Sequence, residues 1–411
     1  MIQIEGGVTA AKGFLAAAAA ANIKYTGRTD MALVYSEVPA ASAGVFTTNV
    51  VKAAPVKWGI KLVKEQQTAQ AVVLNSGIAN AVTGALGEEI NKTMAQAVAD
   101  ELHMDVNQVF TASTGVIGMQ MDAEKLKKGA QLLVPALAAG TEAGNQAARA
   151  IMTTDTVSKE YAVQVDIKGK TVTIGGMAKG SGMIHPNMAT MLSVITTDAA
   201  IEKELLQQTL KEIVQDTFNM ISVDRDTSTN DTLIVLANGM AENEMLRVNS
   251  KDKDYIVFYE GLETVCRELA KQMAADGEGA TKLFETQVIH AKTKEEAKLL
   301  AKSVITSNLV KTAVYGSDAN WGRIFCAMGY SGVSFDPDKV DLYIETSSGQ
   351  LRLKLVENGM ALDYSEEEAT EILSQKHVTA IADMKEGEAE ATAWGCDLTY
   401  DYVKINGDYR S

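Results

Sequence analysis

The sequence has few of the residues that build disulfide or metal sites. It contains three cysteines in 411 residues, and their odd number and wide spacing argue against a disulfide framework and against a zinc ribbon. A reducing compartment therefore fits best. The four histidines show none of the spacings of a helical metal site, so no metal is expected, although carboxylates alone could still hold magnesium.

Positive charge and long apolar runs are also scarce. The 38 basic residues are outnumbered by 53 acidic ones, which gives a net charge of −15, and no basic stripe suits a nucleic-acid backbone. The apolar run at residues 14–21 falls short of the ~20 residues that span a membrane. It also lacks the basic start of a signal peptide. We therefore predict a buried segment there, and a cytoplasmic protein with neither nucleic acid nor membrane as partner.

The hydrophobic pattern predicts a mixture of helices and strands. Residues 86–102 predict a helix, because Ile90, Met94 and Val98 recur at four-residue spacing. Other helical patterns cover 122–152 with a break near Pro135 and Gly140, 205–218, 258–273, a capped helix from Thr293 toward Leu309, and one from Ser365.

Alternating residues predict hairpins at 161–174 and 340–355, and residues 191–195 predict a buried strand. The fold class is therefore α/β or α+β with substantial antiparallel sheet, because the strict βαβ order is missing. The length suggests two or three domains, with a boundary near residues 277–292.

The densest polar and glycine-rich segment covers residues 175–198. It places Lys179, Ser181, His185 and Thr190 just before the predicted buried strand. A hydroxyl at the mouth of such a strand, behind a glycine-rich loop, could be a nucleophile. The order of residues does not match a phosphate loop. A purely structural turn explains the glycines equally well.

Four further segments could line a site, and each also has a structural explanation. Small residues at 111–118 could present amides to an oxyanion, or could form a plain turn. Residues 153–156 could contact substrate or end a helix. The polar block 224–232 could be a network of side-chain caps or an exposed loop. Glu278, between two glycines, could hold a substrate ammonium or lie in an acidic turn.

Eight strings occur in an order that identifies a family. They are GVFTTNVVKAAPV at 44–56, STGVIG at 113–118, MTTDT at 152–156, KGSGMIHPNMATML at 179–192, DTSTNDT at 226–232, DGEGATK at 276–282, DANWGRI at 318–324 and GCDLTYDYVKIN at 395–406. With these strings the chain resembles the ornithine acetyltransferase family of arginine biosynthesis over nearly its whole length.

The resemblance implies a self-processing nucleophile. The precursor would cleave itself between Ala189 and Thr190, which starts a new chain at Thr190. The Thr190 hydroxyl would then be the nucleophile and its α-amine the general base, since an N-terminal amine has a pKa of roughly 7.7–8.0. Thr114 and Gly115 match the family's oxyanion hole.

The resemblance also implies the reaction. An acetyl group would pass from N2-acetylornithine to Thr190, ornithine would leave, and glutamate would accept the acetyl group to give N-acetylglutamate. No cofactor is implied, although acetyl-CoA could be a second acetyl donor. The implied substrate contacts are Thr153, Lys179, Thr190, Glu278, Asn406 and Ser411. By their charges, Lys179 suits a carboxylate and Glu278 suits the side-chain ammonium of ornithine.

The implied architecture is a four-layer α-β-β-α core with a smaller C-terminal α/β domain. Cleavage would give an α chain of residues 1–189 and a β chain of residues 190–411. Residues 190–285 would complete the core and residues 286–411 would form the second domain. Two α and two β chains would make a heterotetramer.

Two alternatives stay open, and four residues depart from the family pattern. The chain could be a related self-processing aminopeptidase or another hydrolase, or a non-catalytic binding protein with the same fold. The departures are Arg225 where glycine is expected, Gly407 where alanine is usual, Ser411 in place of threonine and Ile78 in place of asparagine.

Overall fold

The computed structural model describes residues 1–185, 191–248 and 252–407. Within these limits the chain divides into two compact units. The first unit covers Met1–Gly180, Pro186–Asn219 and Thr227–Ala270, and the second covers Ser181–His185, Met220–Asp226 and Lys271–Ser411. Neither unit ends at the predicted cleavage boundary after residue 189 or at the predicted domain boundary after residue 285, and both boundaries stay predictions.

The first unit is built on a sheet with nine strands in the described residues, in the order β1-β6-β7-β8-β9-β3-β4-β5 with β2 paired to β3. Its elements are β1 (Ile2–Ile4), β2 (Phe14–Ala19), β3 (Met31–Phe46), α1 (Ala54–Glu65), β4 (Thr68–Asn75), α2 (Gly84–Leu102), β5 (Val109–Ser113), α3 (Ala123–Leu133), α4 (Thr141–Ala150), β6 (Lys159–Ile167), β7 (Lys170–Lys179), β8 (Leu192–Thr197), α5 (Lys203–Ile213), β9 (Thr232–Ala237) and α6 (Lys253–Ala275).

Strand β3 belongs to both halves of this sheet. Residues 31–36 pair with β2 and residues 31–35 and 40–41 with β4, while residues 41–46 pair with β9. The register shifts between Tyr35 and Ala40, where Pro39 removes a backbone donor. The strand can therefore pass from one half to the other, and the two halves stack face to face.

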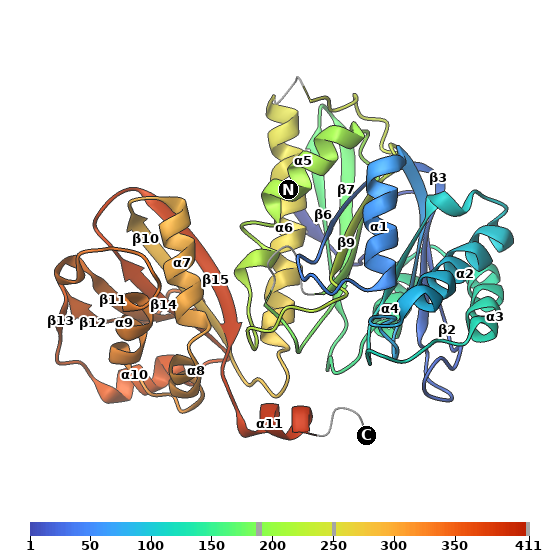
Figure 1. Cartoon of the computed structure of the whole chain (residues 1–411). Coiled ribbons are helices and arrows are strands. Elements are labelled where there is room, and N and C mark those ends of the chain that lie inside the picture. The colour runs from blue at the N-terminus through green and yellow to red at the C-terminus, as the bar shows by residue number, and fades with distance from the viewer. Residues whose placement is uncertain (186–190, 249–251, 408–411) are drawn as a thin grey trace. The chain divides into compact units, whose positions relative to one another are not determined.

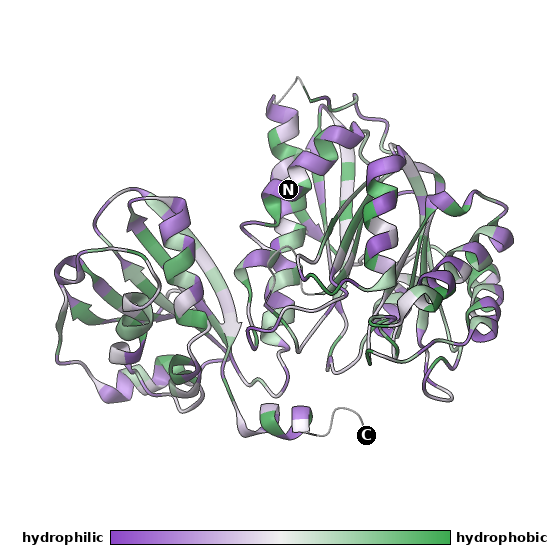
Figure 2. Cartoon of the chain, viewed as in Figure 1, coloured by the Kyte–Doolittle hydropathy of each residue, from purple (hydrophilic) through white to green (hydrophobic). Residues whose placement is uncertain are grey.

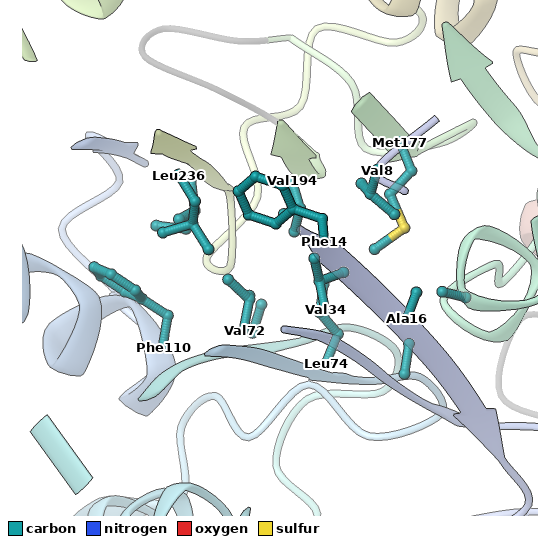
Figure 3. Packing of buried hydrophobic residues seen from close by; sticks show 14 of the residues in the cluster. Val8, Phe14, Ala16, Val34, Val72, Leu74, Phe110, Met177, Val194 and Leu236 are labelled. Carbon is teal, nitrogen blue, oxygen red and sulfur yellow. The ribbon is translucent and has the colours of Figure 1, made fainter. Parts of the chain in front are cut away.

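The space between the two halves is the main hydrophobic core. Phe14, Val34 and Val72 from β2, β3 and β4 meet Met177 and Val194 from β7 and β8 in one buried cluster (Figure 3). Apolar residues at alternate positions of each strand face this layer, as the two-residue period of a strand requires. Burial of this apolar area is the main force that holds the first unit together.

Helices cover the outer faces of both halves. Ile90 and Met94 of α2 and Leu126 of α3 join a second buried cluster on the far side of β3 and β4. On the other half, a β-carbon at Gly261 of α6 would lie 3.0 Å from Ile174 of β7. The predicted four-layer α-β-β-α core is thus confirmed, with α2 and α3 outside one half and α6 outside the other (Figure 1).

The second unit contains a mixed sheet with six strands in the described residues, in the order β13-β12-β11-β14-β10-β15. Its elements are β10 (Leu283–Ala291), α7 (Lys294–Ile305), α8 (Asn308–Tyr315), α9 (Trp321–Gly329), β11 (Asp341–Thr346), β12 (Arg352–Glu357), β13 (Met360–Ala361), α10 (Glu366–Leu373), β14 (His377–Asp383), β15 (Ala389–Cys396) and α11 (Tyr400–Gly407). The smaller C-terminal α/β domain is therefore also confirmed.

Most predicted elements are present, and two predicted helices end early. The hairpin predicted at 161–174 is β6 and β7, and the apolar run at 14–21 contains the buried strand β2. The helix capped by Thr293 stops at Ile305, because Ser307 accepts a hydrogen bond from the Val310 N–H and starts a new helix. The pattern at 205–218 likewise ends as a helix at Ile213.

Hydrophobic and hydrophilic residues are interleaved along helices α1 and α2 (Figure 2). This distribution is what helices with one buried face require. Among the described residues, no helix combines the length and the apolar composition that a bilayer crossing needs.

Candidate active site

Three residues predicted for the site lie outside the described residues: Ala189, Thr190 and Ser411. The cleavage junction and the nucleophile therefore stay predictions. The other predicted residues are described. Thr114, Gly115, Thr153 and Lys179 belong to the first unit, and Glu278 and Asn406 belong to the second. Each group is described by itself.

Lys179 brings the predicted residues of the first unit together. It ends β7, and its side chain is only 9% exposed. Its Nζ donates hydrogen bonds to Thr153 Oγ1 at 2.9 Å and to Thr114 Oγ1 at 3.4 Å. Residues 114, 153 and 179, far apart in the sequence, thus form one cluster. A buried ammonium group beside two hydroxyls is suited to binding an anionic part of a ligand.

Asp155 holds this cluster in place. Its Oδ1 accepts hydrogen bonds from Lys159 Nζ and the Gly180 N–H, both at 2.7 Å, and its Oδ2 lies 3.9 Å from Lys179 Nζ. Burial alone would raise the pKa of Asp155, but the charges of Lys179 and Lys159 outweigh it and lower that pKa well below its ordinary value. The carboxylate therefore stays ionised, and it orients the backbone just after Lys179.

Only glycine fits the backbone at position 115. Its φ of +127° is unfavourable for other residues, and an added β-carbon would lie 2.4 Å from the Gly77 carbonyl oxygen. Within the described residues, its N–H makes no hydrogen bond, whereas the Thr114 N–H donates to Asn75 O at 3.0 Å. An oxyanion here could therefore receive the Gly115 N–H and the Thr114 hydroxyl, but not the Thr114 amide.

Buried amides of two asparagines fix the turn that carries Thr114. Ser113 Oγ donates to Asn75 Oδ1 at 2.6 Å, and Asn230 Nδ2 donates to Ser113 O at 2.8 Å and to Ala79 O at 2.5 Å. Asn230 comes from the polar block 224–232, so its interpretation as a side-chain network is confirmed at this residue. Sequence reasoning assigned no role to Asn75, whose only signal was its place at the end of an apolar run.

Glu278 is the centre of the group in the second unit. Its side chain is buried, its N–H donates to Ser181 O at 2.8 Å, and its Oε2 accepts from Asn406 Nδ2 at 2.7 Å. A β-carbon at Gly182 would lie 2.2 Å from the Glu278 carboxylate, so a larger residue there would displace that carboxylate. The structure thus brings Glu278 and Asn406 together, and a buried carboxylate of this kind could bind an ammonium group.

His185 is an uncharged, partly buried side chain. Its Nδ1 lies 3.0 Å from Ser222 Oγ. Burial, followed by the positive charges of Lys302 and Arg225, lowers the pKa of His185 to about 4. The ring is therefore neutral near pH 7. His185 lies four residues before Ala189, so its charge affects the segment that precedes the predicted cleavage junction.

Cys266 is a core residue of α6, as its position in the apolar stripe predicted. It is completely buried, and burial raises the pKa of its thiol well above the ordinary value. A thiol of this kind is not a nucleophile at neutral pH. The other two cysteines, Cys326 and Cys396, are likewise unpaired.

The departures from the family pattern have different structural consequences. Arg225 has a φ of +70°, a conformation that glycine adopts more easily. Ile78 is buried in the core cluster behind β3 and β4, while its carbonyl oxygen accepts from Asn75 Nδ2 at 2.9 Å. Gly407 ends α11 and has open space around it. Of these three, only Arg225 carries conformational strain.

Acidic, histidine and cysteine side chains do not gather at a metal site in the described residues, where no group of three or more could hold a metal ion. The two clusters instead offer hydroxyls, one free amide, buried lysines and a buried carboxylate. The first cluster suits an anionic group and the stabilisation of an oxyanion, and the second suits an ammonium group.

A family model named ArgJ matches residues 15–411. The arginine biosynthesis bifunctional protein ArgJ of Caldanaerobacter subterraneus is 52% identical over 408 residues, which cover 99% of each chain. The protein of the same name from Bacillus subtilis is 46% identical over 412 residues, covering 100% of this chain and 98% of the relative.

Solved structures of similar proteins match part of the chain. The arginine biosynthesis bifunctional protein of Bacillus halodurans is 46% identical with a TM-score of 0.48, and the match covers 52% of this chain and 96% of that one. The ornithine acetyltransferase of Mycobacterium tuberculosis, complexed with ornithine, is 43% identical with a TM-score of 0.42, and the match covers 46% and 96%.

Proposed function

The chain belongs to the ArgJ family and is an acetyltransferase of arginine biosynthesis, and we propose how its residues carry out the transfer. The acetyl group moves from N2-acetylornithine to glutamate in two steps, with Thr190 as the intermediate carrier. The observation that carries this proposal is the cluster in which Lys179 Nζ contacts the hydroxyls of Thr114 and Thr153, beside the Gly115 N–H.

Self-cleavage prepares the nucleophile. The Thr190 hydroxyl oxygen attacks the carbonyl carbon of Ala189, the peptide C–N bond breaks, and the freed nitrogen takes a proton to become the α-amine of Thr190. Water then hydrolyses the resulting ester, which leaves a carboxylate on Ala189 and a free hydroxyl on Thr190. The new α-amine can serve as general base, because its ordinary pKa of roughly 7.7–8.0 lies near neutral pH.

Acetyl transfer repeats this chemistry on the substrate. The Thr190 oxygen attacks the acetyl carbonyl of N2-acetylornithine, the C–N bond breaks, and ornithine leaves with the proton on its amine. The amine of glutamate then attacks the acetyl ester, which releases N-acetylglutamate and restores the hydroxyl. Each attack creates an oxyanion. The Gly115 N–H and the Thr114 hydroxyl are suited to stabilise it, because the hydroxyl accepts from Lys179 and keeps its own proton to donate.

Charged side chains select the substrate in this proposal. Lys179 binds a carboxylate with Thr153 beside it, and Glu278 with Asn406 binds the side-chain ammonium of ornithine. Ser411 completes the substrate contacts. No cofactor takes part. The relatives carry the name bifunctional, and we propose acetyl-CoA as the second acetyl donor to glutamate.

The same proposal includes assembly and location. The α and β chains stay together as a heterotetramer of two of each, with a mass of ~88 kDa from two precursors of 43.9 kDa. A cytoplasmic location agrees with three unpaired cysteines. The aminopeptidase and the non-catalytic alternatives are not favoured, since the relatives at 46–52% identity are named for arginine biosynthesis.

Intact mass under denaturing conditions tests the proposal first. Cleavage before Thr190 divides 411 residues into 189 and 222, which share the 43.9 kDa as ~20 and ~24 kDa. The Thr190→Ala precursor should stay whole and lack transfer from N2-acetylornithine to glutamate. A single wild-type species of 43.9 kDa would overturn the self-processing nucleophile. Glutamate with acetyl-CoA alone should also yield product, and none would remove the second activity.

A further inference from the structure

Two successive amides of the segment Ser181–His185, just ahead of the predicted cleavage junction, donate to one carboxylate. Asp224 accepts hydrogen bonds from the Met183 N–H at 2.6 Å and from the Ile184 N–H at 2.8 Å. The Val223 N–H, next to it, donates to Ile184 O at 2.7 Å. Charge-assisted bonds of this length are among the stronger ones in proteins. The path of the backbone here therefore depends on Asp224.

The segment needs this support because its conformation is unfavourable. Met183 has a φ of +54°, and its side chain is about half exposed, so no core packing holds it there. A left-handed conformation costs a residue other than glycine roughly 1–2 kcal/mol. The two hydrogen bonds to Asp224 offset that cost. Without them, the segment would relax to another conformation.

The last helix of the chain contacts the same carboxylate. Tyr402 of α11 donates its hydroxyl to Asp224 Oδ2 at 3.3 Å. Burial, followed by the charge of Asp224, raises the pKa of Tyr402 above its ordinary value, so the hydroxyl keeps its proton. A second contact runs through Glu278, which accepts from Asn406 of α11 and donates its N–H to Ser181 O.

Helix α11 depends on such contacts for its own stability. It has eight residues and none of them is buried. A helix this short is unstable in water unless tertiary contacts hold it. Helix α11 and the segment 181–184 therefore support each other, although more than 200 residues separate them in the sequence.

We propose that Tyr402 and Asp224 act as a pair of positioning residues that couple self-cleavage to the docking of the C-terminal helix. The inference rests on the proposed self-processing and adds a control on its timing. Cleavage at Ala189–Thr190 reaches its full rate only after the end of the chain has been made and α11 has closed onto Asp224. A precursor whose second unit is incomplete then stays whole.

The test measures the rate of cleavage in the full-length chain. The protein is made by cell-free translation, synthesis is stopped with an inhibitor, and samples are quenched in guanidinium chloride and weighed intact at intervals. Tyr402→Phe removes one hydroxyl from a surface helix and should slow cleavage by a factor of about 10 or more, the loss expected for one hydrogen bond to a charged acceptor. Asp224→Asn should slow it further.

A matched control separates this effect from a general loss of stability. The hydroxyl of Tyr364, also in the second unit, donates one comparable bond of 3.4 Å to Ala319 O. Tyr364→Phe should leave the cleavage rate unchanged, although it also removes a tyrosine hydrogen bond and lowers the melting temperature. The double variant with Tyr402→Phe and Asp224→Asn should cleave no more slowly than Asp224→Asn alone, because the two residues act as one unit.

The activity of the cleaved product completes the test. Once fully processed, Tyr402→Phe should keep the wild-type kcat per cleaved chain, and KM for N2-acetylornithine is measured separately because α11 also carries Asn406. Wild-type cleavage kinetics in Tyr402→Phe, or equal slowing in Tyr364→Phe, would overturn the inference while the proposed function stands. A wild-type chain that never cleaves would overturn the proposed function as well.

Discussion

Gly115 lies against Gly77 so closely that a β-carbon added to Gly115 would come within 2.4 Å of the Gly77 carbonyl oxygen. The Gly115 N–H has no acceptor of its own in the described residues. An amide donor that is fixed in advance and left unused is what stabilisation of an oxyanion requires. The fold thus provides the donor before the substrate arrives.

Replacement of Gly115 by alanine should therefore disrupt this conformation and displace the N–H donor, which alanine retains. We expect Gly115→Ala to lower kcat for acetyl transfer by a factor of about 100 or more, the usual loss for one oxyanion donor. Gly118→Ala is the matched control, because Gly118 also has a positive φ of +79° but has open space around it. It should cost about 1 kcal/mol of stability and retain activity. Equal activity losses in both variants would contradict the role of Gly115.

The hydroxyl group of Thr114 should contribute more to catalysis than the volume of its side chain does. The Thr114 N–H already donates to Asn75, so only the hydroxyl is free to contact an oxyanion. We expect Thr114→Val, which keeps the volume, to lower kcat by a factor of about 100, while Thr114→Ser keeps most activity. Steady-state assays of acetyl transfer from N2-acetylornithine to glutamate measure the difference. Full activity in Thr114→Val would exclude Thr114 from the oxyanion hole.

Arg225 occupies a conformation that favours the glycine expected from the family pattern. Its φ is +70°, and relief of that strain outweighs the greater freedom that glycine gives the unfolded chain. We expect Arg225→Gly to raise the free energy of unfolding by about 0.5–1 kcal/mol, measured by urea denaturation. As a control of opposite sign, Lys128→Gly in the exposed face of α3 should lower it by about 1 kcal/mol.

Local patterns in the sequence were sufficient for most elements. The hairpin of β6 and β7 follows from alternation around the turn Lys168-Gly169-Lys170, and α2 follows from apolar residues at four-residue spacing. The long strand β3 could not be predicted in this way. Its two ends pair with different strands, and its small residues, such as Ala40 and Ala43, are selected by close packing rather than by strand propensity.

Site residues that belong to the family motifs could be predicted from the sequence. Thr114, Gly115, Thr153 and Lys179 came from the family resemblance, and the structure brings Thr114, Thr153 and Lys179 into one cluster, with Gly115 next to Thr114 in the chain. Lys159 was missed, although it is fully buried against Asp155 at 2.7 Å. A lysine in a strand is usually exposed, and no sequence pattern linked it to Asp155, four residues earlier. The link from Asn230 to Ser113 spans 117 residues, and no local pattern encodes it.

The low pKa of His185 makes stability depend on pH. In the unfolded chain the ring titrates near 6.5, and in the fold its pKa is about 4, because of burial and then the charges of Lys302 and Arg225. Between these values the unfolded state binds more protons, so the free energy of unfolding falls as pH drops from about 6.5 toward 4.

Because the ring is partly exposed, we expect a loss of only about 1 kcal/mol between pH 7.5 and pH 5. His185→Asn should lack this part of the pH dependence. The difference between the two proteins, measured by urea denaturation at both pH values, cancels the titration of all other groups. Arg225→Gly removes one of the two charges and should reduce the loss. A difference that is independent of pH would mean that His185 titrates alike in the folded and unfolded states.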